Sequence, residues 1–330
     1  MYRKFLLKER RIEVYFLGID LGGTTIKGGI VDKTGNILTQ GQVPTRAEAG
    51  AEAVLAQIEN LTKELKARVG ISDGQLRGAG IGIPGSVDVE KGLVRLAPNL
   101  HWRNFPLRGK LEKLLGIPVV LDNDAHVAAL GEMWQGAGRD YQDILMITIG
   151  TGIGSAVILN GQVHRGIFGY GAEMGHVKVE PHGPLCECGG RGCLETLASA
   201  TAIVRQARQE LERGRPSLLR GKETLEARDV LVAAGQGDEL AREVLNRAAG
   251  YLGIALANAV LLIGPTVVIL GGGVAQAGEV ILGPLKERFE EALGPWQIKP
   301  LPLLLAQLGN KAGFVGAAYL ALSFLRGEGK

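Results

Sequence analysis

One pattern occurs twice in this sequence and restricts its fold more than any other feature. An apolar run, a glycine-rich turn and a second apolar run occupy residues 15–31, and the same arrangement returns over residues 144–159. Gly22 and Gly150 mark the two turns, and a polar turn residue follows each of them after ten residues, so the repeat distance is 128 in both cases. This repeat predicts two domains built on one plan, each with a glycine-rich hairpin. The alternative is that any two β-hairpins share such a pattern.

Strands alternate with helices along the rest of the chain, which is typical of a layered α/β protein. We expect strands at residues 15–21, 25–31, 37–43, 78–83, 119–121, 144–149, 155–159 and 266–270. We expect helices at residues 54–65, 107–115, 125–133, 240–262, 279–293 and 313–325. The last of these helices is expected to return to the first domain.

Composition and charge exclude several classes of protein. The 50 glycines among 330 residues show no three-residue period, which excludes collagen. The 37 basic and 34 acidic residues are spread along the chain, so we expect no nucleic-acid partner. Residues 248–278 carry no charge, but Gly264 and Pro265 interrupt them ahead of the buried strand at 266–270. We therefore expect a soluble cytoplasmic protein with no membrane partner.

The first hairpin turn carries residue types that bind a phosphate. Residues 20–27 read Asp-Leu-Gly-Gly-Thr-Thr-Ile-Lys, in which glycines and threonines offer N–H and O–H donors and Lys27 adds charge. Asp20 is placed to hold a hydrated Mg²⁺. A strand follows these glycines, and the chain has no Walker A motif, so neither a dinucleotide fingerprint nor a P-loop is predicted. Together with two later glycine-rich turns, the pattern predicts one ATP site, formed by Asp20, Gly22, Gly23, Thr24, Thr25, Lys27, Gly150, Thr151, Gly152, Gly154, Gly271, Gly272 and Gly273.

Three cysteines, Cys186, Cys188 and Cys193, lie within eight residues. In a cytosolic chain such a cluster favours a metal site over a disulfide. Three thiolates need one more ligand for tetrahedral Zn²⁺, and His176 and His182 are the candidates. The alternative is a set of three reduced structural thiols.

The motifs of this chain, in their order, resemble those of the ROK family of sugar kinases, within the actin-like ATPase superfamily. They are Asp20-x-Gly-Gly-Thr-x-x-Lys27, Gly-Ile-Pro-Gly85, Asp122-Asn-Asp-Ala125, the run 150–154, Glu173-Met-Gly-His176 and Cys186-x-Cys188-x-x-x-x-Cys193-Leu-Glu195. The resemblance extends from about Phe16 to the C-terminus and is greatest to the bacterial glucokinases. It implies an α/β fold of two ribonuclease-H-like lobes with a cleft between them. The smaller lobe would comprise residues 1–124 with about 311–330, and the larger lobe, with a zinc-binding loop, residues 125–310.

The resemblance also implies an activity and a role for each motif residue. It implies ATP-dependent phosphorylation of glucose to glucose 6-phosphate, with Asp124 as the general base on the 6-hydroxyl. It selects His176 as the fourth ligand of a structural Zn²⁺. The implied sugar contacts are Pro84, Gly85, Asn99, Asn123, Asp124, Glu173, His176 and Glu195. From the residues alone, Asn123 or Asp124 could instead be a helix cap.

Several alternatives stay open at this level. Many actin-like ATPases have a second acidic residue where this chain has Thr148, so we expect Asp20 to hold the Mg²⁺ with the ATP phosphates. Related kinases act on fructose, N-acetylmannosamine, N-acetylglucosamine or allose, and polyphosphate could replace ATP. A sugar-responsive repressor is less favoured, because the hairpin begins about 16 residues into the sequence. We expect a homodimer or larger homo-oligomer. We expect zinc loss to weaken glucose binding. We expect ATP binding to stay nearly unchanged, because the phosphate hairpins lie elsewhere in the chain.

Overall fold

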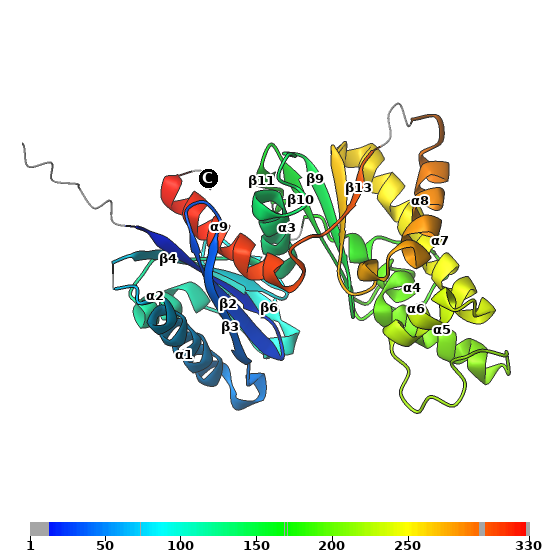
Figure 1. Ribbon diagram of the computed structural model, residues 1–330, viewed down its shortest axis with the longest axis horizontal. Helices are drawn as coiled ribbons and strands as arrows, with labels where there is room; N and C mark the ends of the chain where they lie inside the picture. Colours follow the sequence, from blue (N-terminus) through cyan, green and yellow to red (C-terminus); the bar gives the residue numbers. More distant parts are fainter. Residues whose placement is uncertain (1–12, 73, 168, 170, 297–300, 328–330) are drawn as a thin grey trace, which may run out of the picture. The chain divides into compact units, whose positions relative to one another are not determined.

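The computed structural model describes residues 13–72, 74–167, 169, 171–296 and 301–327, and their contacts divide them into two compact units. The first unit contains the described residues up to Asp122 and those from Ala317 onward; the second extends from Asn123 to Gly316. Each unit is centred on a five-stranded sheet (Figure 1). The predicted α/β class is confirmed. The contacts divide the chain after Asp122 and Gly316. The predicted lobe boundaries, after residues 124 and 310, stay predictions.

The sheet of the first unit has the order β3-β2-β1-β4-β8. Its strands are β1 (Tyr15–Leu21), β2 (Thr25–Asp32), β3 (Ile37–Pro44), β4 (Leu76–Ile83) and β8 (Val119–Asn123). The first three pair antiparallel as two hairpins, and β4 pairs parallel with β1. A parallel strand between neighbours is buried on both faces, which explains the continuous apolar runs of β1 and β4.

Helices cover both faces of this sheet. On one face, α1 (Ala51–Val69) places Leu61 against Gly28 of β2 (Figure 1). On the other, a Cβ at Gly80 of β4 would lie 1.8 Å from the carbonyl oxygen of Ala317 in α9 (Ala312–Arg326), so only glycine fits there. The short helix α2 (Leu107–Leu115) and a small sheet of β5 (Ser86–Asp88), β6 (Leu93–Ala97) and β7 (Trp102–Phe105) complete the unit.

The second unit repeats the strand order of the first, as β11-β10-β9-β12-β13. The strands are β9 (Ile144–Ile149), β10 (Ile153–Leu159), β11 (Gln162–Val163), β12 (Val267–Gly271) and β13 (Leu303–Leu305). The helices are α3 (Asp124–Gln135), α4 (Glu195–Ala198), α5 (Ala200–Glu212), α6 (Ala227–Gly235), α7 (Glu239–Ile263) and α8 (Glu279–Leu293). Two sheets with the same order confirm the predicted ribonuclease-H-like plan.

The two repeats differ at the turn that matters for function. In the first hairpin Leu21 pairs with Ile26, and in the second Ile149 pairs with Ile153, so the second turn is one residue shorter. The predicted repeat distance of 128 therefore holds in the first strand of each hairpin and is wrong where the second strand begins. As a result Asp20 faces Lys27, whereas Thr148 faces Gly154. The second hairpin lacks both charges of the first.

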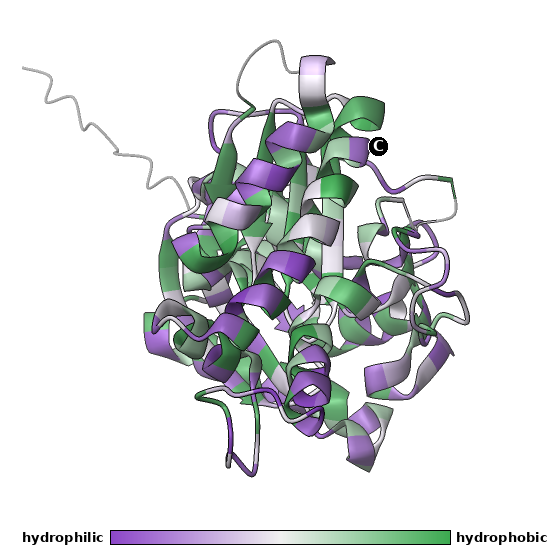
Figure 2. Cartoon of the chain, turned by 90° about the vertical axis from the view of Figure 1, so that its right-hand side faces the viewer, coloured by the Kyte–Doolittle hydropathy of each residue, from purple (hydrophilic) through white to green (hydrophobic). Residues whose placement is uncertain are grey.

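Among the described residues, one helix, α7, is long and apolar enough to cross a membrane, a test that buried helices of soluble proteins also pass. Here α7 lies beside α8 (Figure 1) and buries one side, including Leu245, Leu252 and Leu256, in the core of the second unit. Its end is the predicted turn: Gly264 adopts φ +67° as the C-cap, and the buried strand β12 follows. Figure 2 shows purple and green segments alternating along the helices that face the viewer, as amphipathic helices over a core do.

Candidate functional site

Asp20 and Lys27 form the charged part of the first hairpin. They are directly opposite each other on β1 and β2, at the end next to the turn. Burial raises the pKa of the Asp20 carboxyl above its usual range, and the Lys27 ammonium acts against this rise. A cation placed beside Asp20 would lower this pKa and favour the ionised carboxylate, which is the form that binds Mg²⁺.

The turn between these strands is held by a residue that the sequence did not single out. Thr45, fully buried after β3, donates its hydroxyl to the carbonyl of Gly22 at 2.6 Å and its N–H to the carbonyl of Thr24 at 2.9 Å. Gly22 in turn donates its N–H to the carbonyl of Thr25 at 3.1 Å. A single threonine beyond a strand has no recognisable spacing, so only the fold reveals that it shapes the phosphate turn.

Two candidate sugar-binding segments of the first unit are also fixed by close backbone approach. Gly85 adopts φ +111°, and a Cβ there would lie 2.2 Å from the carbonyl oxygen of Leu96, so the turn after Pro84 requires glycine. Asn99 is exposed and lies against the phosphate turn, since a Cβ at Gly23 would be 2.9 Å from the Asn99 Cβ. The fold therefore brings a candidate sugar contact to a candidate phosphate contact.

Asn123 and Asp124 stand where β8 ends and α3 begins. The Asn123 Oδ1 accepts the N–H groups of Ala125 at 2.8 Å and His126 at 3.3 Å, so Asn123 is the N-cap. Asp124 is the first helical residue, and its Oδ1 accepts the Ala125 N–H at 2.9 Å. The N-terminal end of a helix favours a negative charge. The cap is formed by the amide oxygen of Asn123.

The second glycine-rich turn meets the third one at the end of β9. Gly271 pairs with Thr148, and Val274 donates its N–H to the carbonyl of Ile149 at 3.2 Å. Gly272 adopts φ +86°, and a Cβ there would lie 2.4 Å from the same Ile149 oxygen. Position 272 must therefore be glycine for this run to lie so close to the hairpin, whereas a Cβ at Gly273 would meet nothing within 4 Å.

A pocket of about 660 Å³ opens between these two turns and α6. Gly150, Thr151 and Gly273 contribute glycine-rich backbone to its wall. The other lining residues come from α5, α6 and the segment after β12, and are Ala200, Glu226, Ala227, Arg228, Leu231, Val232, Val274, Gln276 and Ala277. A pocket with phosphate-type turns at one side and mixed apolar and polar walls suits a nucleoside. The α6 residues carry no motif, so the sequence analysis did not identify them.

Glu173 and His176 belong to a loop attached to β10. Ser155 of β10 donates its hydroxyl to the carbonyl of Ala172 and accepts the N–H of Met174 at 2.9 Å. A Cβ at Gly175 would lie 2.3 Å from the carbonyl oxygen of Ile153. Glu173 and His176 flank Met174 and Gly175, and both are exposed. Glu195 begins α4, and its Oε2 accepts the N–H of Ile153 at 2.8 Å.

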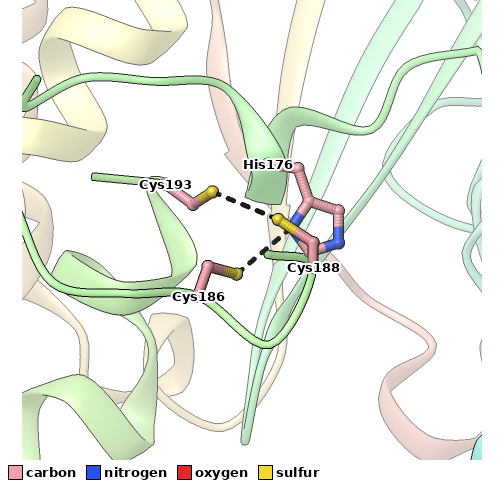
Figure 3. A group of neighbouring side chains, drawn as sticks. All are labelled: His176, Cys186, Cys188 and Cys193. Carbon is pink, nitrogen blue, oxygen red and sulfur yellow. Dashed lines mark hydrogen bonds between the residues drawn. The ribbon is translucent and has the colours of Figure 1, made fainter. Parts of the chain in front are cut away.

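His176 and the three cysteines converge on one point, as Figure 3 shows. Their four candidate ligand atoms all lie within 4.8 Å of one another. The Cys186 Sγ is 3.7 Å from the His176 Nδ1, and the Cys188 Sγ is 3.6 Å from the Cys193 Sγ. A Zn–S bond of about 2.3 Å places tetrahedral ligand atoms about 3.8 Å apart, so this donor set fits Zn²⁺. His182, the other candidate, is outside the group.

The surroundings of this cluster suit a negatively charged metal complex. Lys178 donates its Nζ to the Cys193 Sγ at 3.0 Å and to the carbonyl of His176 at 2.7 Å. Three thiolates and a neutral imidazole around Zn²⁺ carry one net negative charge, which the ammonium offsets. Without a metal, burial raises the pKa of the Cys186 thiol to about 11. A bound Zn²⁺ would remove that proton.

The predicted site residues thus form two groups. In the first unit the structure places Asp20, Gly22, Gly23, Thr24, Thr25, Lys27, Pro84, Gly85 and Asn99. In the second unit it places Asn123, Asp124, Gly150, Thr151, Gly152, Gly154, Glu173, His176, Cys186, Cys188, Cys193, Glu195, Gly271, Gly272 and Gly273. Within each unit, residues far apart in sequence come together at the glycine-rich hairpin.

Comparisons with known proteins agree with this arrangement. The sequence pattern of the ROK family matches residues 16–323. The glucokinase of Thermotoga maritima is 42% identical over 308 residues, which are 92% of this chain and 95% of that protein. A ROK family glucokinase from Streptomyces griseus, solved with glucose and AMPPNP, is 39% identical with a TM-score of 0.79 over 93% of this chain and 99% of that one. The ROK hexokinase from Thermus thermophilus is 37% identical, with a TM-score of 0.83 over 95% of this chain and 100% of that one. This chain belongs to the ROK family.

Proposed function

We propose that this protein is a glucokinase, which transfers the γ-phosphoryl group of ATP to the 6-hydroxyl of glucose. The observation that carries the proposal is the meeting of three segments at the second hairpin. Nucleotide-type turns border a pocket of about 660 Å³, and the loop with Glu173 and His176 is anchored to the same hairpin through Ser155. The similar Streptomyces griseus structure contains glucose and AMPPNP together. A kinase needs such a shared location for sugar and nucleotide.

In the proposed mechanism Asp124 accepts the proton of the 6-hydroxyl as that oxygen attacks the γ-phosphorus. Phosphoryl transfer otherwise depends on positioning and on stabilisation of charge. Asn123, held in place as the helix cap, positions a sugar hydroxyl through its side-chain nitrogen. Asn99, the Pro84–Gly85 turn, Glu173, His176 and Glu195 supply the remaining sugar contacts. Polar pairs of this kind bind adjacent hydroxyl groups and select the sugar.

Two metal ions belong to the proposal. Asp20 would hold Mg²⁺, which neutralises charge on the ATP phosphates. His176, Cys186, Cys188 and Cys193 would hold a structural Zn²⁺, with the His176 Nδ1 toward the metal. The Nε2 of the same ring would then be available to a sugar hydroxyl. The metal would thereby fix the orientation of a sugar-binding side chain.

We further propose that the protein is cytoplasmic and forms a homodimer or larger homo-oligomer. In support of self-association, α7 exposes Ile254, Leu261 and Leu262, the last with 87% of its surface accessible. Light scattering of the purified protein measures the assembly directly.

A coupled assay of ADP release tests the proposed activity. We expect phosphorylation of glucose with ATP to exceed that of fructose, allose, N-acetylmannosamine and N-acetylglucosamine in kcat/KM. A parallel series with polyphosphate identifies the phosphoryl donor. A preference for another sugar would reassign the substrate within the same reaction class. Absence of turnover with every sugar and donor would contradict the kinase.

We predict that Asp20→Ala and Lys27→Ala lower activity by about 10²-fold, the usual effect of losing one group that stabilises a transferring phosphoryl. The two variants should differ in their dependence on Mg²⁺. Raising the Mg²⁺ concentration should partly restore Asp20→Ala, because mass action compensates for a weakened metal site, and should leave Lys27→Ala unchanged. Steady-state rates across a Mg²⁺ series make the measurement, with Lys33→Ala, in the turn between β2 and β3, as the control. Equal insensitivity of both variants would remove the metal role from Asp20.

A further inference from the structure

The second phosphate turn is held from outside the hairpin by one short segment, residues 195–201. Ile153, which directly follows the turn, donates its N–H to the Glu195 Oε2 at 2.8 Å. Ala200 donates its N–H to the carbonyl of Gly150 at 2.8 Å, and Thr201 donates its hydroxyl to the carbonyl of Thr151. Three bonds therefore fix the backbone whose N–H groups would face the ATP phosphates.

Glu195 also shapes this turn sterically. A Cβ at Gly152 would lie 2.3 Å from the Glu195 Oε2, so the carboxylate fills the space beside that glycine. The other carboxylate oxygen, Oε1, has no hydrogen-bond partner among the described residues. One carboxylate oxygen thus accepts a hydrogen bond from the hairpin, and this bond orients the other oxygen. An oriented acceptor with a fixed neighbour is what a sugar hydroxyl requires.

The second sugar-side loop reaches the same strand. Gly175 lies against the carbonyl of Ile153, and Ser155 bonds the backbone of Ala172 and Met174. Ile153 is therefore in contact with two of the segments that carry candidate sugar ligands: its N–H with Glu195 and its carbonyl with the loop of His176. These two segments thus meet at a single backbone residue.

We propose that Glu195 positions the second phosphate hairpin through Ile153, so that sugar recognition and ATP binding are coupled within this unit. The proposal rests on the proposed function, since it takes Glu195 as a sugar contact. When a sugar hydroxyl binds Oε1, the carboxylate loses rotational freedom, and the hydrogen bond from Ile153 becomes more persistent. The ATP phosphates then meet a turn that is already ordered. By thermodynamic reciprocity, ATP raises sugar affinity by the same factor.

Calorimetric titration with AMPPNP, in the absence of sugar, tests the positioning role. Glu195→Gln keeps an acceptor for the Ile153 N–H and should bind AMPPNP within about twofold of wild type. Glu195→Ala leaves that N–H unpaired and should bind AMPPNP about 5- to 20-fold more weakly. Thr201→Val should weaken it by about threefold, since its bond is exposed. Thr266→Val is the matched control, because Thr266 also donates an exposed hydroxyl to a carbonyl, that of Asp143 at 2.9 Å, away from the turn.

Glucose titrations of the same variants separate this role from sugar contact. Both Glu195 variants should lose glucose affinity, whereas Thr201→Val should retain it without nucleotide. In wild type, glucose should tighten AMPPNP binding. Glu195→Ala should abolish the part of this increase in affinity that is transmitted through Ile153. AMPPNP affinity in Glu195→Ala equal to wild type, or equal losses in the Gln and Ala variants, would overturn the proposal. If Glu195→Ala does not fold, judged by thermal unfolding, Glu195→Gln decides, and AMPPNP affinity weakened well beyond twofold in that variant would overturn the proposal. AMPPNP affinities that follow the expected order of the variants, in a protein that phosphorylates no sugar, would reject the proposed function and the coupling to sugar, and would keep only the positioning of the turn by Glu195.

Discussion

Replacement of Asp124 by Asn should lower kcat by about 10²–10⁴, the range that a general base contributes. The amide is nearly isosteric with the carboxylate but cannot take the proton of the sugar hydroxyl. Its oxygen can still accept the Ala125 N–H, which Asp124 accepts at 2.9 Å, so α3 should begin at the same residue. Folding and glucose binding should therefore survive. Steady-state kinetics with glucose, together with calorimetric glucose binding, measure both effects.

Asp140→Asn provides the control for this experiment, because Asp140 is exposed beyond the end of α3. That variant should keep wild-type kinetics. A value of kcat near wild type in Asp124→Asn would contradict the general-base role. A large change in KM at normal kcat would make Asp124 a binding residue instead.

Replacement of Cys188 by Ser should remove most of the bound zinc and weaken glucose binding by at least about tenfold, the scale on which altered metal shells act. Binding of a structural metal is coupled to folding of the loop that carries its ligands. The loop here includes His176, and only Leu194 separates Cys193 from Glu195. Backbone bonds join its two arms: Leu194 donates its N–H to the carbonyl of Val177 at 2.9 Å. Elemental analysis should find about one Zn²⁺ per wild-type chain.

AMPPNP binding should weaken too in the Cys188 variant. Sequence order alone predicts that ATP binding is nearly unchanged, because the hairpins are distant along the chain. The hydrogen bond from Ile153 to Glu195 changes this expectation, since it ties the cysteine loop to the phosphate turn. His182→Ala, outside the metal group, should keep both zinc and ligand affinities. Zinc-free protein purified without chelator would contradict the metal site, and zinc loss with unchanged glucose affinity would separate the metal from sugar recognition.

Long apolar runs made much of the fold predictable. The strands of both sheets near the hairpins, and helices such as α1 and α7, are found where periodicity places them. The sequence does not reveal β5, β11 or β13, because strands of two or three residues show no alternation. Nor does it reveal α6, whose role as a pocket wall depends on tertiary contacts.

The candidate site was predictable in its parts and less so in its connections. The glycine-rich turns and the cysteine cluster are recognisable from residue type and spacing. Thr45 and Ile153 are not recognisable in this way, because their roles come from hydrogen bonds between side chain and backbone that join segments 23 and 42 residues apart in sequence. The sequence also left open whether Asn123 is a cap or a ligand, and the structure shows the cap.

The C-terminal helix gives this protein an unusual order of assembly during synthesis. Residues 317–326 of α9 belong to the first unit, where the backbone of Ala317 packs against Gly80. The ribosome must make the whole second unit before it reaches them, and at about 5–20 residues per second this takes roughly 10–40 s. During that time the first sheet lacks the cover that α9 gives to one of its faces, although all its strands already exist. The nascent chain therefore presents an apolar sheet face to chaperones. In a protein truncated before α9, that face would stay exposed permanently.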